Sequence, residues 1–159
     1  MQKEDKIYPN DKILTINCDA SWNPNKSIGG WAFWISHSSG RFKRWGEFKN
    51  PVTDSNEAEI KACCNALYFV MSGNNFNALK LIIINCDNSV VRDIINKKKI
   101  NDRYKAEGNK LLDLCSKYEL VIAKVIKGHK TNYNPRQYVN NWCDEYSRKY
   151  LIVCKKKIK

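Results

Sequence analysis

The sequence predicts a mixed α/β fold in which helices flank a five-stranded sheet. Three stretches with the pattern of strands follow one another without an intervening helix, and two later apolar strands are each preceded by a helical segment. Consecutive strands joined by turns pair antiparallel, whereas strands joined through helices run parallel with right-handed crossovers. We therefore expect the first three strands to be antiparallel and the first strand to lie beside the fourth at the centre of the sheet.

The first three strands form a continuous antiparallel succession. KILTINCDA, residues 12–20, has the apolar alternation of a strand and is followed by the turn-rich stretch WNPNKSIGG. Residues 31–38 and 41–50 are rich in aromatic residues, and Ser39-Gly40 between them is typical of a short turn. The second and third strands are therefore expected to form a hairpin.

A helix is expected next, from Ser55 to about Met71. Its apolar residues recur with helical periodicity, and Asp54 and Glu57 have the spacing of a capping box at its start. The polar stretch 72–75 ends the helix, because Gly and Asn interrupt the pattern there.

The second half of the chain alternates between strands and helices. LKLIIINCD, residues 79–87, is apolar on both faces, as expected of a central strand that helices cover. A short helix that contains residues 90–95 and a longer one over 102–118 precede the last strand, residues 120–127. A terminal helix is expected from about 138 to 154.

Length and charge indicate one domain with a polyanionic partner. The chain has 159 residues, which fits a single domain over 12–154 between a polar lead, 1–11, and a basic tail, 155–159. It carries 28 Lys and Arg against 16 Asp and Glu, a net charge of +12, and nucleic acid is the commonest partner of so basic a surface. An AT-rich genome also favours lysine codons, so composition alone leaves a second explanation open.

Cysteine usage and hydropathy indicate an intracellular protein. The seven cysteines are odd in number and have no C-x-x-C spacing, which argues against a disulfide framework or a zinc site and favours small buried hydrophobes in a reducing compartment. The N-terminus has no signal-peptide apolar region, and no apolar stretch approaches the length of a membrane span. We expect a monomer without membrane contact, located in the cytoplasm, the nucleoid or another intracellular compartment of a host.

Four acids occupy unusual positions in these elements. Asp19 and Asp87 each end a copy of the tetrapeptide INCD, on two strands expected to be neighbours. Glu59 lies on the apolar stripe of its helix, whereas Glu57 points nearly opposite, to the surface. Asp144 lies on the polar side of the last helix. Each alone can be a turn, capping or solvent-facing residue, but together they predict an acidic cluster at one edge of the sheet.

A cluster of carboxylates requires cations. Two carboxylates about 4 Å apart repel by about 4 kcal/mol at an effective dielectric constant near 20. Hard oxygen ligands of this kind suit Mg²⁺ or Mn²⁺. Two such ions, about 3.5–4 Å apart, can activate a water and stabilise the leaving oxygen in phosphodiester cleavage. The combination of basic surface and acidic cluster therefore favours a nuclease.

The motifs around these acids resemble those of type 1 ribonuclease H. The match runs through nearly all of residues 12–150, with every element in the expected order. Its motifs are D-A-S-W-N-P…G-G-W at 19–31, N-x-x-E-x-x-A…A-L at 56–67, C-D-N-S-V-V at 86–91, G-H at 128–129 and N-x-x-C-D-E-x-x-R at 140–148.

The resemblance implies a ribonuclease H-like fold and a reaction. Asp19, Glu59, Asp87 and Asp144 would be the catalytic acids that bind two Mg²⁺ ions, with Mn²⁺ as the other option, and no small-molecule cofactor is implied. The implied substrate is the RNA strand of an RNA–DNA hybrid, cut to leave a 5′-phosphate and a 3′-hydroxyl. His129 matches the family's catalytic histidine, and an imidazole that titrates near neutral pH suits proton shuttling or product release.

The resemblance also implies substrate contacts and shows departures from the pattern. Polar side chains that reach 2′-hydroxyls distinguish RNA from DNA. The matching positions are Asn23, Ser55, Asn56 and Ser89. Ala20 stands where the family has Gly, and the chain between Asp87 and His129 is shorter than in members with a basic protrusion. The lysines at 97–99 or in the tail could serve as a substrate handle instead, or only as solvated charges.

Two alternative functions remain open at this point. One is a nucleic-acid-binding module on the same fold without catalytic activity, although a phosphate-binding protein would gain by losing the four acids. The other is a DNA-cutting nuclease of the resolvase or integrase type, which shares this architecture.

Overall fold

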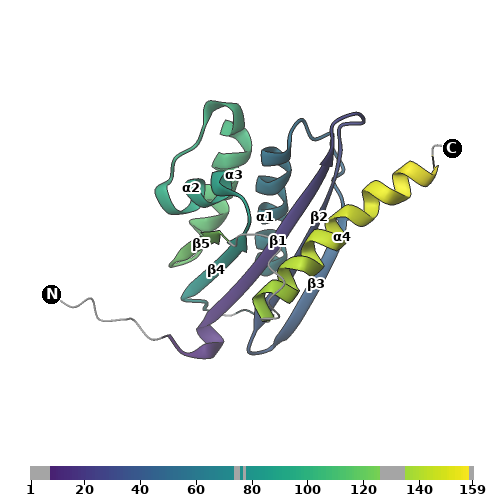
Figure 1. Ribbon diagram of the computed structural model, residues 1–159. Coiled ribbons are helices and arrows are strands. Elements are labelled where there is room, and N and C mark those ends of the chain that lie inside the picture. Colours follow the sequence, from purple (N-terminus) through teal and green to yellow (C-terminus); the bar gives the residue numbers. More distant parts are fainter. Residues whose placement is uncertain (1–7, 74–75, 77, 126–134, 158–159) are drawn as a thin grey trace.

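In the computed structural model, one sheet separates a layer of three helices from a single helix on the other face (Figure 1). The structure describes residues 8–73, 76, 78–125 and 135–157. The strands are β1 (Ile13–Asn23), β2 (Ile28–His37), β3 (Gly40–Glu47), β4 (Leu81–Cys86) and β5 (Val121–Val125). The sheet has the order β3-β2-β1-β4-β5. The first three strands pair antiparallel, and β4 is parallel to both β1 and β5, which confirms the predicted fold class.

The helices cover both faces of this sheet. The helices are α1 (Ser55–Ser72), α2 (Ser89–Lys97), α3 (Lys105–Cys115) and α4 (Pro135–Lys157), with short 3₁₀ turns η1 (Asn10–Lys12) and η2 (Asp102–Tyr104). α1 packs on β1 and β2, and α2 and α3 complete that layer beside it, with α2 on β5. α4 crosses the opposite face, over β1, β2 and β3 (Figure 1). No helix in the described ranges is long and apolar enough to cross a bilayer.

The main hydrophobic core lies between the sheet and α1. Alternate residues of the central strands enter it, because successive side chains of a strand point to opposite faces. They include Leu14, Ile16 and Cys18 of β1 and Ile82, Ile84 and Cys86 of β4, each at most 1% exposed. Burial of this kind is the main favourable term in folding, about 25 cal/mol per Å² of apolar surface.

Most elements begin or end a few residues away from the predicted positions, and two of these differences change the description of the site and the hairpin. β1 runs on to Asn23, because β2 begins at Ile28 and pairs with it across a four-residue turn. Asp19 therefore lies within a strand rather than at its end. The hairpin turn consists of Ser38-Ser39 instead of Ser39-Gly40, since Gly40 pairs with His37 and already belongs to β3.

Glu57 is buried, with 8% of its surface exposed, so the expectation of a surface residue is wrong. Asp54 caps α1 as expected, by accepting a hydrogen bond from the Glu57 amide at 2.8 Å. The Glu57 carboxylate turns back and accepts from the amide and hydroxyl of Thr53, both at 2.7 Å, and pairs with Lys61 at 3.0 Å. Burial favours a higher pKa for Glu57, but these partners outweigh it and leave the pKa below its ordinary value.

Candidate metal centre

The two copies of INCD lie side by side in the sheet. Ile16 pairs with Ile84, and Asn17 pairs with Asn85, in the parallel register of β1 and β4. The same register carried two residues further brings Asp19 beside Asp87. Strand alternation turns the Asp19 side chain away from the main core, toward the α4 side of the sheet, and Asp87 directly follows the last residue of β4.

Glu59 reaches this position from the first turns of α1. Its Oε1 accepts a hydrogen bond from the Ala20 amide at 3.3 Å, and the same amide donates to Asp19 Oδ1 at 2.9 Å. One carboxylate oxygen from each of Asp19, Glu59 and Asp87 lies within 4.8 Å of the others. Asp19 and Glu59 are buried, whereas Asp87 is exposed, so the group is closed on the protein side and open at Asp87.

The electrostatics of this group favour a bound cation. Burial, together with the negative charge of Asp87, raises the pKa of Asp19 from its ordinary value to about 7. Burial and the charge of Asp19 raise the pKa of Glu59 well above its ordinary range. Glu59 Oε2 is buried and has no hydrogen-bond partner among the described residues. A buried oxygen without a partner is costly, and a divalent cation with oxygen ligands would satisfy it, so these residues fit Mg²⁺ or Mn²⁺.

Asp144 approaches the group from α4 but lies outside the set of three. Its charge is one of the causes that raise the pKa of Asp19, so the two carboxylates are near neighbours electrostatically. Arg148, one turn further along α4, holds it through an ion pair of 3.2 Å between Nη2 and Oδ1. Three of the four predicted acids therefore form one compact group, and Asp144 contributes to its electrostatics from α4.

The packing of α4 on the sheet sets the position of Asp144. Gly30 of β2 lies directly against the Ser147 carbonyl group, and a side chain at Gly30 would collide with it. The Ser21 hydroxyl donates to the same carbonyl oxygen. The absence of a side chain at Gly30 thus lets α4 approach the backbone of β2 closely, three residues beyond Asp144.

Several buried polar residues on the central strands and on α4 were not foreseen from the sequence. They are Asn17, Asn85, Asn140 and Ser147, each at most 5% exposed. The buried side of α4 therefore contains Asn140 and Ser147 together with Cys143, while Trp142 and Tyr146 are only half-buried. The alternation of INCD could have revealed Asn17 and Asn85, because residues between buried strand positions must face the other helix layer.

The predicted substrate-binding residues lie at helix starts and at a turn. Ser55 and Ser89 are exposed as the first residues of α1 and α2. Asn23 ends β1, where its side chain accepts a hydrogen bond from the Asn25 amide at 3.0 Å. His129 lies outside the described residues.

Asn56 already has protein partners. Its amide nitrogen donates to the Tyr104 hydroxyl at 3.1 Å, and its amide oxygen accepts from Asn88 at 2.9 Å. Asn88 also caps α2, by accepting from the Val91 amide. Asn56 therefore joins the starts of α1 and α2 and brings Ser55 and Ser89 to the same part of the surface.

Comparisons with known proteins identify the family and the fold. The sequence model of the RNase H family matches residues 11–151. The chain is similar in structure to an RNase H1 from the halophilic archaeon Halobacterium salinarum, with 14% identity, a TM-score of 0.66, and coverage of 87% of this chain and 97% of that one. No curated protein matches the chain in sequence.

Two further solved structures have the same fold. The N-terminal RNase H domain of a Mycobacterium tuberculosis protein is 11% identical, with a TM-score of 0.68 and coverage of 92% of this chain and 99% of that one. An RNase H1 named LC11, solved in complex with an RNA/DNA hybrid, is 17% identical, with a TM-score of 0.64 and coverage of 87% and 99%.

Proposed function

Because the chain belongs to the RNase H family, we propose that it is a metal-dependent endonuclease that hydrolyses the RNA strand of RNA–DNA hybrids. The observation that carries the proposal is the convergence of Asp19, Glu59 and Asp87 within 4.8 Å, with a buried Glu59 oxygen that has no partner in the described part of the chain. The hybrid bound in the structure of a similar RNase H1 supports the same class of substrate.

The four acids would together hold two Mg²⁺ ions, or Mn²⁺ in their place. When bound, the ions supply an activated water and stabilise the leaving oxygen, so that the products carry a 5′-phosphate and a 3′-hydroxyl. The protein's own part is to hold the ligands in place. The Ala20 amide fixes Asp19 and Glu59 from the β1 side, and Arg148 fixes Asp144 from α4.

Substrate recognition would use the surface formed by the starts of α1 and α2. Ser55 and Ser89 present hydroxyls there, Asn56 would contact the hybrid through the part of its amide group that its bonds to Tyr104 and Asn88 leave free, and Asn23 would contact it from the end of β1. Groups that both donate and accept hydrogen bonds can contact the 2′-hydroxyls that distinguish RNA from DNA. The net charge of +12 would hold the phosphate backbones of the hybrid.

His129 would assist turnover rather than bind metal. An imidazole that changes charge near neutral pH can move protons or help release the product. We expect His129→Ala to slow multiple-turnover cleavage by about 10–10³-fold without abolishing it. An unchanged rate would show that His129 does not reach the reacting groups.

We also propose that the protein acts as a monomer in an intracellular compartment.

The proposal is tested by comparing substrates and metals in one assay. Labelled hybrid, duplex RNA, duplex DNA and single strands are incubated with Mg²⁺, Mn²⁺ or EDTA, and the products are resolved by length and end group. We expect cleavage of the RNA strand of the hybrid alone, with 5′-phosphates, and none in EDTA. Cleavage of duplex DNA would indicate a nuclease of the resolvase or integrase type, and binding without cleavage would indicate a catalytically idle module.

A further inference from the structure

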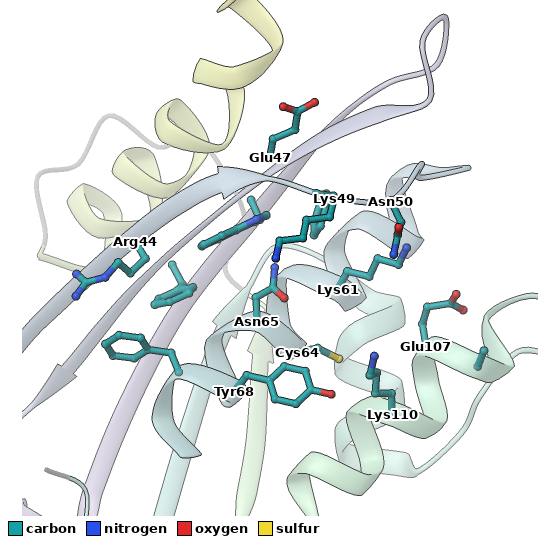
Figure 2. A pocket seen from close by; sticks show the side chains of 15 residues that line it. Arg44, Glu47, Lys49, Asn50, Lys61, Cys64, Asn65, Tyr68, Glu107 and Lys110 are labelled. Carbon is teal, nitrogen blue, oxygen red and sulfur yellow. The ribbon is translucent and has the colours of Figure 1, made fainter. Parts of the chain in front are cut away.

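A pocket of about 860 Å³ lies on the α1 side of the sheet, away from the acidic group. Its walls are formed by β2 and β3, by the segment that follows β3, and by the outer faces of α1 and α3 (Figure 2). None of the four acids or of the residues assigned to hybrid binding lines it. We call it the aromatic groove, because five of its lining residues are Trp31, Phe33, Phe48, Tyr68 and Phe69.

The rings of the aromatic groove form a supported platform. Trp31 and Phe33 are stacked, with centroids 5.5 Å apart and planes 13° apart, and Phe69 packs against Phe33 at 5.4 Å. Gly46 of β3 lies under the Trp31 indole so closely that a Cβ there would be 2.8 Å from the ring. Tyr68 has 42% of its surface exposed, so part of this aromatic surface is open to solvent.

The groove also concentrates positive charge around the rings. Its charged lining residues are Arg44, Glu47, Lys49, Lys61, Glu107 and Lys110. Figure 2 shows the side chains of Lys49, Lys61 and Lys110 extending into the space between β3, α1 and α3, whereas Glu47 points away from it. The Lys110 ammonium lies 5.8 Å from the centre of the Tyr68 ring. Within the described residues, neither Lys49 nor Lys110 forms an ion pair, so both charges are available to a ligand.

We propose that the aromatic groove binds an unpaired nucleic-acid strand. Base stacking on aromatic rings, with cations that follow the phosphates, is the chemistry by which proteins hold single strands. Each nucleotide supplies both an aromatic face and a phosphate, so a strand would use the rings and the lysines together. An acidic peptide would match the lysines but supplies an aromatic side chain only where its sequence has one.

The position of the groove connects it to the acidic group through α1. Glu59 and Lys61 are two residues apart on this helix and point to different sides, one to the acids and the other to the groove. A strand that leaves the hybrid near the start of α1 would pass this turn and enter the groove. This placement of the strand as an extension of the substrate rests on the proposed function, whereas binding of a free single strand does not.

The test measures how much an unpaired extension adds to binding. Fluorescence anisotropy in EDTA compares a blunt RNA–DNA hybrid, the same hybrid with an unpaired extension of about six nucleotides in its DNA or its RNA strand, and free single strands of each kind. The variants are Lys49→Ala/Lys110→Ala and Tyr68→Ala. The controls are Lys117→Ala/Lys124→Ala, which removes two exposed lysines outside the groove, and Tyr68→Phe, which keeps the ring. Thermal melts confirm that each variant is folded.

We expect the extension to tighten binding to the unaltered protein by about tenfold, and both groove variants to remove most of that gain. The slope of log K against log salt for free strands should become shallower by about 1.4 in Lys49→Ala/Lys110→Ala, because about 0.7 is lost for each phosphate contact. Both control variants should keep the gain. Comparing the gain in affinity for hybrids extended in the DNA strand with that for hybrids extended in the RNA strand shows which kind of strand the groove holds.

Three results would overturn the proposal. In the first, the extension adds no affinity and free strands bind the groove variants as tightly as the unaltered protein. In the second, the control lysine pair loses as much affinity as the groove pair, which would indicate diffuse attraction only. In the third, a peptide rich in Asp and Phe binds in a groove-dependent way while single strands do not. Failure of the proposed function looks different: the hybrid would be neither bound nor cut, while free strands still bind and respond to the groove variants.

Discussion

The two faces of the central sheet are built from the same tetrapeptide and have opposite chemistry. In both β1 and β4, the Ile and Cys of INCD enter the apolar core under α1, and the Asn lies on the opposite face of the sheet, which α4 covers at β1. On the α1 face, Ile16 and Ile84 are completely buried, and burial raises the pKa of the neighbouring Cys86 thiol, which therefore stays neutral. The six described cysteines are all free, as expected of small hydrophobes.

The α4 face carries the unfavourable features of the molecule. Three buried polar atoms have no hydrogen-bond partner among the described residues, and all belong to residues of this side or of the acidic group. They are Asn17 Oδ1, Trp34 Nε1 and Glu59 Oε2. Such groups cost stability in any fold. The comparison suggests that the α1 face stabilises the fold and that the α4 face is arranged for metal and substrate at some cost in stability.

The largest expected effect is the loss of cleavage when Asp87 is changed. Asp87→Asn keeps the shape of the side chain but removes one of the charges that would hold the metal ions. We expect Mg²⁺-dependent hybrid cleavage to fall by at least about 10³-fold, with hybrid binding in EDTA preserved. The measurement is single-turnover cleavage beside an anisotropy titration. Asp113→Asn, an exposed acid on α3, is the matched control. Undiminished cleavage by Asp87→Asn would remove Asp87 from the site.

The next effect concerns the α1 face of the sheet and should appear in the free energy of unfolding rather than in the rate of cleavage. Ile84 is fully buried, and Ile84→Ala would leave a cavity in the main core. We expect the free energy of unfolding to fall by about 2–5 kcal/mol, measured by urea denaturation. Cleavage by the fraction that remains folded should change little. A loss of less than about 1 kcal/mol would show that this face is not the main source of stability.

The sequence was sufficient for the sheet order and for the convergence of the acids, because both follow from short-range patterns. Alternation identifies the strands, their connections give the order, and the repeated INCD places Asp19 beside Asp87. The burial of Glu57 could not be predicted in this way. Helical phase gives the direction of a side chain, but the Thr53 groups that cover Glu57 belong to the loop before the helix.

Contacts between distant segments were also beyond the sequence. The side of α4 that is buried depends on Gly30, more than 100 residues away, whose missing side chain admits the helix at Ser147. Trp142 and Tyr146 are more apolar than Asn140 and Ser147, yet they are only half-buried, whereas Asn140 and Ser147 are buried. The aromatic groove combines residues of β2, β3, α1 and α3, and no single stretch contains its pattern.

A smaller effect is expected from pH in the absence of metal. In the folded protein Asp19 keeps its proton up to about pH 7, whereas an unfolded Asp loses it near 3.8. The folded state therefore binds more protons between these values, and the free energy of unfolding falls as pH rises. One such proton corresponds to a decrease on the order of 1–2 kcal/mol between about pH 5.5 and 7.

Urea denaturation in EDTA at several pH values measures this slope. Asp19→Asn should flatten it, because the amide does not titrate. Mg²⁺ should act in the opposite direction and stabilise the protein more at high pH, since the carboxylates must lose their protons to bind it. An equal slope in Asp19→Asn and in the unaltered protein would show that Asp19 does not carry the raised pKa.

The smallest effect should follow from removing a buried polar side chain on the α4 face. Asn17 is 4% exposed, and its Oδ1 has no hydrogen-bond partner within the described ranges, so Asn17→Ala loses little favourable interaction and also removes a desolvated acceptor. The lost interaction lowers the stability and the removal of the unsatisfied acceptor raises it. We therefore expect the free energy of unfolding to change by less than about 1 kcal/mol, which is smaller than the loss expected for Ile84→Ala. The two variants delete side chains from neighbouring central strands, one on each face, so urea denaturation of both compares the faces directly. A loss above about 2 kcal/mol in Asn17→Ala would mean that its amide is satisfied by water and that the α4 face also stabilises the fold.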